Sequence, residues 1–156
     1  MEERVEHPSY YCSGIECIEL LDSLCDGYEG IVAFDIGQSK YLYRCGAKKE
    51  EGLSSIEKAI EDIDKNIFYI KDIKKRKGLR VFSSKDKPSW LAQFIAREFC
   101  VNKPEEIHSY IESYISAFMC KSDSGIYIDV ELALDSLIHI AEYYRNLRDT
   151  SIEAEK

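Results

Sequence analysis

Isoleucine recurs with helical spacing through the centre of the chain. The series comprises Ile56, Ile60, Ile63, Ile67, Ile70 and Ile73. Intervals of three and four residues place all of them on one face of an α-helix. Before the series, Ser54 and Glu57 form a capping box, in which each side chain satisfies a free amide of the first turn. The pattern predicts a helix over 54–77, with Asp62 and Lys65 off the buried face and close enough to pair.

Five further helices are predicted from the same periodicity. Their ranges are 14–25, 26–45, 88–100, 104–118 and 129–148. Asp129 is placed to cap the last helix, and Trp90 lies on the apolar face of the helix that begins at 88. A short extended lead precedes the first helix, because Pro8 keeps His7 out of helical geometry. We therefore expect an all-α fold, a compact helical bundle of about six helices.

A polar segment near the middle of the chain separates two groups of helices. Residues 1–78 are expected to form a three-helix unit that holds the candidate site. Residues 79–148 are expected to form a three-helix extension packed on that unit, and 149–156 a frayed tail. Between the groups, Val81 and Phe82 are a short apolar pair, so any strand there is brief.

Composition narrows the class of protein. A length of 156 residues suits one core, and a 45% hydrophobic share with 32% charged residues is ordinary for a soluble globular protein. No apolar run approaches the roughly 20 residues of a membrane span. The net charge of -8 disfavours general binding to DNA or RNA. Without a signal-peptide pattern or metal-ligand spacing among the cysteines, we expect a cytoplasmic protein with reduced, buried cysteines and no membrane contact.

Against this acidic background, the stretch 37–49 contains four cationic side chains and no acidic one. The cations are Lys40, Arg44, Lys48 and Lys49, with Gln38 and Tyr41 beside them. Lys40 and Arg44 are four residues apart and share a helix face with Tyr41. Because Arg binds phosphate bidentately and Lys adds a point charge, the stretch is a candidate site for a small anionic ligand. Stabilisation of a helix C-terminus by the same cations is the alternative.

Common catalytic motifs are missing from the sequence. It contains neither GxxxxGK[ST] nor GxGxxG, and GxSxG is also absent. The three histidines fall in separate segments without zinc-ligand spacing. Glu16 and Asp62, on two predicted helices, are candidate ligands for Mg²⁺, which prefers oxygen donors. The alternative is that both acids lie on solvated helix faces.

Four motifs follow one another between residues 7 and 70. They are His7-Pro8-Ser9-Tyr10-Tyr11, Gly14-Ile15-Glu16-Cys17-Ile18, Gly37-Gln38-Ser39-Lys40-Tyr41-Leu42-Tyr43-Arg44 with Lys48, and Asp62-Ile63-Asp64-Lys65-Asn66-Ile67-Phe68-Tyr69-Ile70. In this order they resemble the SaV-like family of phage and prophage proteins, also described as domain of unknown function 3310. That family includes a phage nucleotide kinase without the usual phosphate loop. This chain departs from the family pattern at Gln38, Asn66 and Phe68, and its helices after Pro88 lie outside the pattern.

The resemblance implies binding of a nucleotide or a nucleotide-derived small molecule. The residues it agrees with are Lys40, Arg44 and Lys48 for phosphate, Tyr41 or Tyr11 for stacking on a base, and His7 and Gln38 for hydrogen bonds; Lys49 is a further phosphate candidate from the cationic stretch alone. Three functions remain open: a nucleoside monophosphate kinase using Mg²⁺, a noncatalytic protein that sequesters a nucleotide immune signal, and a helical nucleoside triphosphate pyrophosphohydrolase. We prefer nucleotide binding over any one reaction and expect a homo-oligomer.

Overall fold

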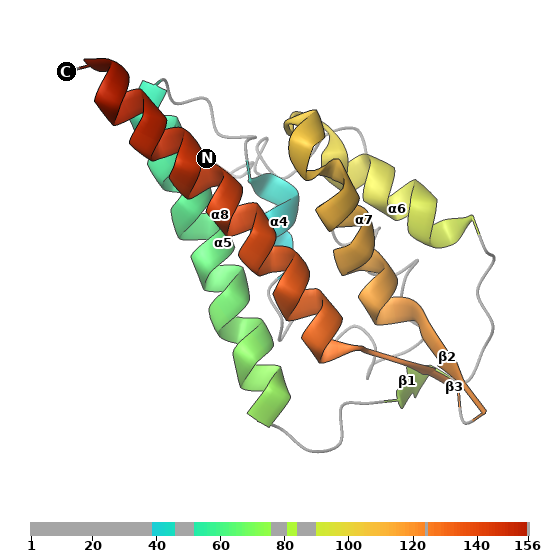
Figure 1. Cartoon of the computed structure of the whole chain (residues 1–156). Helices are drawn as coiled ribbons and strands as arrows, with labels where there is room; N and C mark the ends of the chain where they lie inside the picture. The colour runs from blue at the N-terminus through green and yellow to red at the C-terminus, as the bar shows by residue number, and fades with distance from the viewer. Residues whose placement is uncertain (1–38, 46–51, 76–80, 84–89, 124, 156) are drawn as a thin grey trace, which may run out of the picture.

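A computed structural model describes residues 39–45, 52–75, 81–83, 90–123 and 125–155 of the chain. Within these ranges the fold is all-α, with a small sheet at one end (Figure 1). The helices are α4 (Lys40–Arg44), α5 (Gly52–Lys75), α6 (Leu91–Cys100), α7 (His108–Ser116) and α8 (Val130–Glu155), with single 3₁₀ turns η2 (Glu105–Ile107) and η3 (Ala117–Met119). The described ranges thus contain five α-helices rather than about six. The predicted helix at 14–25, most of that at 26–45 and the extended lead lie outside them.

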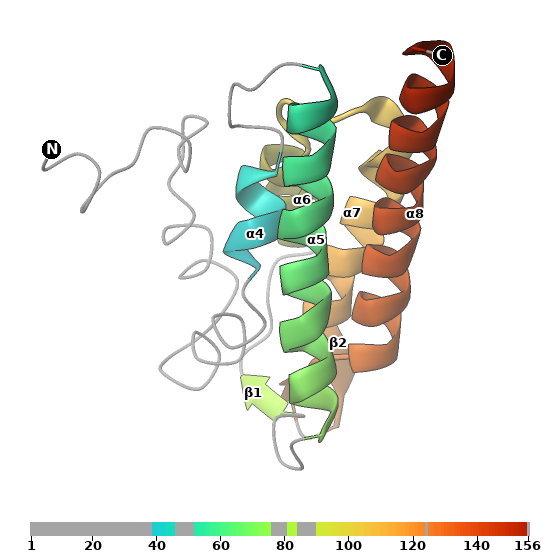
Figure 2. The same ribbon diagram turned by 90° about the vertical axis from the view of Figure 1, so that its left-hand side faces the viewer.

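The two long helices, α5 and α8, lie side by side and run in opposite directions (Figures 1 and 2). Ile63, Ile70 and Ile73 of α5 are buried, which confirms the predicted isoleucine face. Full burial of one such side chain stabilises the fold by about 1.5–3 kcal/mol. Helical geometry in α8 continues past Asp149, where a frayed tail was expected, and ends at Glu155. None of the helices in the described ranges is long and apolar enough to cross a membrane.

Helices α6 and α7 form a hairpin that packs on this pair, with α7 against α8. Phe99, Tyr114 and Phe118 are the largest side chains buried there, and Phe118 contacts Tyr114 edge-on at 5.2 Å between ring centroids. Asn102 takes a left-handed conformation (φ 65°) in the connection, which asparagine tolerates better than most residues. Trp90 was predicted on the buried face of a helix but is 60% exposed, because it precedes the first residue of α6 and so is not part of that face.

Three short strands close the end of the bundle near the start of α8. They are β1 (Val81–Ser83), β2 (Cys120–Ser122) and β3 (Gly125–Tyr127), paired antiparallel in the order β1-β3-β2. A strand does form at Val81 and is brief, as expected of any strand there, whereas the β2–β3 hairpin lies between the helices predicted at 104–118 and 129–148, where no strand was predicted. After β3, the Asp129 carboxylate accepts a hydrogen bond from the Leu132 amide at 3.1 Å, as its predicted capping role requires.

Two phenylalanines provide a matched test of this core. Phe99 is fully buried and Phe68 is 65% exposed, and both lie within helices. Phe99→Ala is expected to lower the free energy of unfolding by about 3–5 kcal/mol, because it leaves a cavity, and Phe68→Ala by less than about 1 kcal/mol. Urea denaturation measures both. Similar losses for the two variants would contradict the packing described above.

Candidate functional site

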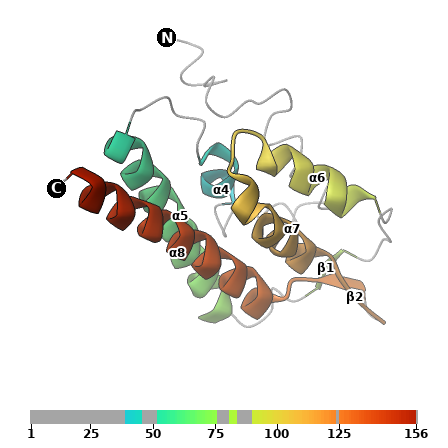
Figure 3. The same ribbon diagram turned by 45° about the horizontal axis from the view of Figure 1, so that its top comes forward.

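The short helix α4 carries the centre of the predicted cationic stretch. Leu42, Tyr43 and Arg44 are buried, while Lys40 and Tyr41 are half-buried. A helix of five residues has too few backbone hydrogen bonds to be stable alone. Its conformation therefore depends on contacts with the helices around it, and α4 packs against α5 and α6 (Figure 3).

The strongest of these contacts is an ion pair between α4 and α5. Nη2 of Arg44 donates a hydrogen bond to Asp62 at 3.1 Å, with side-chain exposures of only 10% and 5%. Asp62 was predicted to lie off the isoleucine face and close enough to Lys65 to pair; in the structure it is buried against Arg44, and Lys65 hydrogen-bonds Glu61. Asp62 is buried because α4 covers that side of α5. A charge-assisted hydrogen bond away from water is stronger than a neutral one and compensates both charges.

Two further polar contacts hold α4 in place. At its start, the Ser39 hydroxyl hydrogen-bonds the Tyr114 hydroxyl from α7, which also accepts a hydrogen bond at 3.3 Å from Nδ2 of Asn66 on α5. Near its end, Nζ of Lys103 donates to the Tyr43 carbonyl oxygen at 2.9 Å, and Lys103 is buried. A cation at the last carbonyls of a helix is favourable. Helix α4 is thus fixed at both ends by residues far away in sequence.

Three cations surround the ring of Tyr41. The Arg44 guanidinium carbon lies 4.6 Å from the ring centroid, Nζ of Lys65 5.4 Å and Nζ of Lys40 5.7 Å. These distances suit cation–π attraction, worth about 0.5–1 kcal/mol each at exposed sites. We call Lys40, Tyr41, Arg44 and Lys65 the Tyr41 cluster. Asp62 pairs with Arg44, and Glu61 accepts a hydrogen bond from Lys65 at 3.0 Å with Lys58 also beside it, so the described cations here outnumber the carboxylates that pair with them.

The structure brings together three of the residues that the sequence singled out, Lys40, Tyr41 and Arg44. Lys65 was not assigned to the site, although it is one turn from Asp62 on α5 and its ammonium group is slightly nearer to the Tyr41 ring than that of Lys40. Only the position of α4 against α5 reveals this, because the sequence does not state which face of α5 meets α4. Six other assigned residues lie outside the described ranges: His7, Tyr11, Glu16, Gln38, Lys48 and Lys49.

Of the two predicted Mg²⁺ ligands, the structure describes Asp62, whereas Glu16 lies outside the described ranges. Asp62 is 3% exposed and its carboxylate accepts the Arg44 hydrogen bond. Binding Mg²⁺ there would require replacing that partner, since Mg²⁺ needs carboxylate oxygens and usually retains several waters. Across the ranges that the structure describes, no three His, Cys, Asp or Glu side chains gather as metal ligands would. The described residues therefore do not fit the predicted ion at Asp62.

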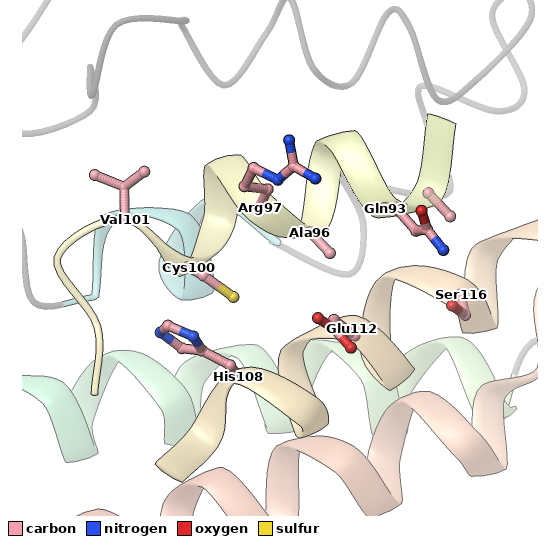
Figure 4. A pocket seen from close by; sticks show the side chains of 9 residues that line it. Gln93, Ala96, Arg97, Cys100, Val101, His108, Glu112 and Ser116 are labelled. Atoms are coloured by element: carbon pink, nitrogen blue, oxygen red, sulfur yellow. The ribbon is translucent and has the colours of Figure 1, made fainter. Parts of the chain in front are cut away.

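A concave groove lies between α6 and α7, with a volume of about 570 Å³ (Figure 4). Gln93, Arg97 and Cys100 of α6 line it, facing His108 and Glu112 of α7. Burial raises the pKa of the Cys100 thiol to about 11, so the sulfur stays protonated at neutral pH and is a poor nucleophile. His108 directs Nε2 at the Lys103 carbonyl oxygen, 2.9 Å away, as a hydrogen-bond donor. This groove is not apparent from the sequence, because it depends on how two helices pair.

Comparisons of the chain with models of protein families, with curated proteins and with solved structures found no match.

Removing one partner of the buried ion pair tests its contribution. Asp62→Ala is expected to lower the free energy of unfolding by about 3–5 kcal/mol, because the Arg44 charge stays buried without its carboxylate. The control is Asp64→Ala, which breaks an exposed ion pair with Arg145 on α8 and should cost less than about 1 kcal/mol. Urea denaturation of both variants at pH 7 measures the difference, and equal losses would contradict a buried, mutually compensating pair.

The buried thiol of Cys45 makes stability depend on alkaline pH. Burial raises its pKa from 9.0 to about 11, against smaller opposing effects of Lys103 and a hydrogen bond with Tyr144. Between about pH 9 and 11 the unfolded chain loses this proton while the folded chain keeps it, so stability falls as pH rises, by on the order of 2 kcal/mol. In Cys45→Ala this part of the loss should disappear. Urea denaturation of the wild-type protein and of Cys45→Ala at pH 8 and pH 10.5 gives the loss of unfolding free energy with pH for each. Equal losses in the two proteins would contradict the prediction.

Proposed function

We propose that this protein binds a nucleotide or a nucleotide-derived small molecule at the Tyr41 cluster. The observation that carries the proposal is the gathering of three cationic groups within 5.7 Å of one aromatic ring. Phosphate is attracted by lysine ammonium groups, and a nucleobase stacks on aromatic rings. The resemblance of residues 7–70 to SaV-like proteins, which include a nucleotide kinase, supports the same ligand class.

Within this proposal the cluster residues have different roles. Lys40 and Tyr41 are the two residues of α4 that are not buried, so they are the ones positioned to meet a ligand. Arg44 is a positioning residue, because its guanidinium is buried beside Asp62 and stacks on Tyr41. We therefore no longer propose that Arg44 contacts phosphate directly, as the sequence had suggested. Its proposed role is to support the Tyr41 ring. Lys48 and Lys49 remain proposed phosphate ligands on sequence grounds.

The groove between α6 and α7 is less suited to a polyanion. It is lined by Arg97 and Glu112, whose opposite charges balance each other, and by the protonated Cys100 thiol. Phosphate groups at neutral pH carry one or two negative charges and need an excess of positive partners. Among the described residues at the Tyr41 cluster, four cations (Lys40, Arg44, Lys58 and Lys65) accompany two carboxylates (Asp62 and Glu61), and this excess is why we place the nucleotide there.

What happens to a bound nucleotide distinguishes three versions of the proposal. A kinase transfers a phosphoryl group, a sequestering protein returns the ligand unchanged, and a pyrophosphohydrolase releases pyrophosphate. Incubating the protein with AMP, GMP, ATP, GTP and a cyclic dinucleotide, with and without Mg²⁺, followed by chromatography, separates them. Sequestration makes the fewest demands on the described residues, since it needs cations and an aromatic ring but no metal ligands.

Replacing Lys40 tests the binding site directly. Lys40→Ala is expected to weaken binding of the best ligand in this panel about tenfold or more, because a charge-assisted contact to phosphate is lost. Lys71→Ala is the matched control, since Lys71 is an exposed lysine further along α5 and should leave affinity unchanged. Titration calorimetry measures both dissociation constants. Unaltered affinity in Lys40→Ala, with the fold intact by circular dichroism, would exclude the Tyr41 cluster as the site.

A further inference from the structure

Lys65 has two neighbours, an aromatic ring and a carboxylate. Its ammonium group lies 5.4 Å from the centroid of the Tyr41 ring and donates a hydrogen bond at 3.0 Å to the carboxylate of Glu61, one turn earlier on α5. Glu61 is also 3.8 Å from Nζ of Lys58. All three charged side chains are between 42% and 50% exposed. One carboxylate is thus shared by two lysines, at the edge of the Tyr41 cluster.

We propose that Lys65 is a ligand-binding residue whose ammonium group exchanges Glu61 for a phosphate of the bound nucleotide. In the free protein the Glu61 carboxylate pairs with the Lys65 ammonium group, and it thereby competes with the ligand for that group. This inference rests on the function proposed above and adds one phosphate-binding residue and one regulating carboxylate to the same site. No covalent step is involved, since one ion pair is exchanged for another.

The energetics of exposed ion pairs permit this exchange. Such pairs contribute little to stability, since water screens both charges and ordering two long side chains has an entropic cost. A phosphate offers more negative charge and more acceptor oxygens than one carboxylate. When Lys65 leaves, Lys58 remains beside Glu61 and keeps that carboxylate compensated. In the free protein the hydrogen bond with Glu61 raises the pKa of Lys65, as expected for an ammonium group paired with a carboxylate.

A double-mutant cycle tests the exchange. The probe is the nucleotide of the panel that binds the wild-type protein most tightly, measured by titration calorimetry at fixed ionic strength. Glu61→Gln is expected to raise its affinity about threefold to fivefold, because the competitor is removed, and Lys65→Met to lower it about tenfold. In the double variant, Glu61→Gln should no longer raise affinity, because the lysine that it released is gone.

A charge-matched control separates competition from general electrostatics. Glu57→Gln removes one negative charge from the same helix, one turn before Glu61, and is expected to change affinity by less than about a factor of two. An equal gain from Glu57→Gln, or a gain from Glu61→Gln that persists in the Lys65→Met background, would overturn the exchange. Affinity unchanged by both single variants would overturn it too. If the wild-type protein binds nothing in the panel, the proposed function fails and this inference fails with it.

Discussion

The buried ion pair between Arg44 and Asp62 is the contact on which the candidate site depends. A helix as short as α4 cannot persist through its own hydrogen bonds, so its place against α5 must come from tertiary contacts. Inside a protein, an Arg–carboxylate pair is favourable only when both charges are compensated in good geometry, and a lone charge there is costly. The pair therefore fixes α4 against one face of α5 and leaves few alternatives.

The fixed position of α4 determines which of its side chains are accessible at the surface. Leu42, Tyr43 and Arg44 are buried, whereas Lys40 and Tyr41 are half-buried and so remain in part accessible at the surface. Preorganised groups lose less entropy on binding than groups that must first be ordered, which favours affinity for a small ligand. The long lysine side chains can still adjust, because only their backbone is held. The cluster therefore combines an aromatic ring on a held helix with long lysine side chains, as the proposed binding of a nucleotide requires.

The C-terminal half of the chain supports this arrangement, although the family resemblance stops before it. Tyr114 of α7 joins Ser39 to Asn66 through one hydroxyl group, and Lys103 holds the last turn of α4 from the connection after α6. These contacts span 48 to 75 residues of sequence. Helix α8, packed along α5, completes the core beneath them. The helices after 88 are thus part of the same body as α4 and α5.

Local periodicity by itself determined the helical class of this protein, the buried isoleucine face of α5 and the cap at Asp129, since each depends on residues within one or two turns. It also brought Lys40 and Tyr41 into one candidate site, as neighbours on a helix. Only the tertiary structure decided that Asp62 faces Arg44 and that Lys65 reaches the Tyr41 ring. The physical reason is that a helical pattern shows which positions share a face, but the partner of a face is set by packing between segments distant in sequence.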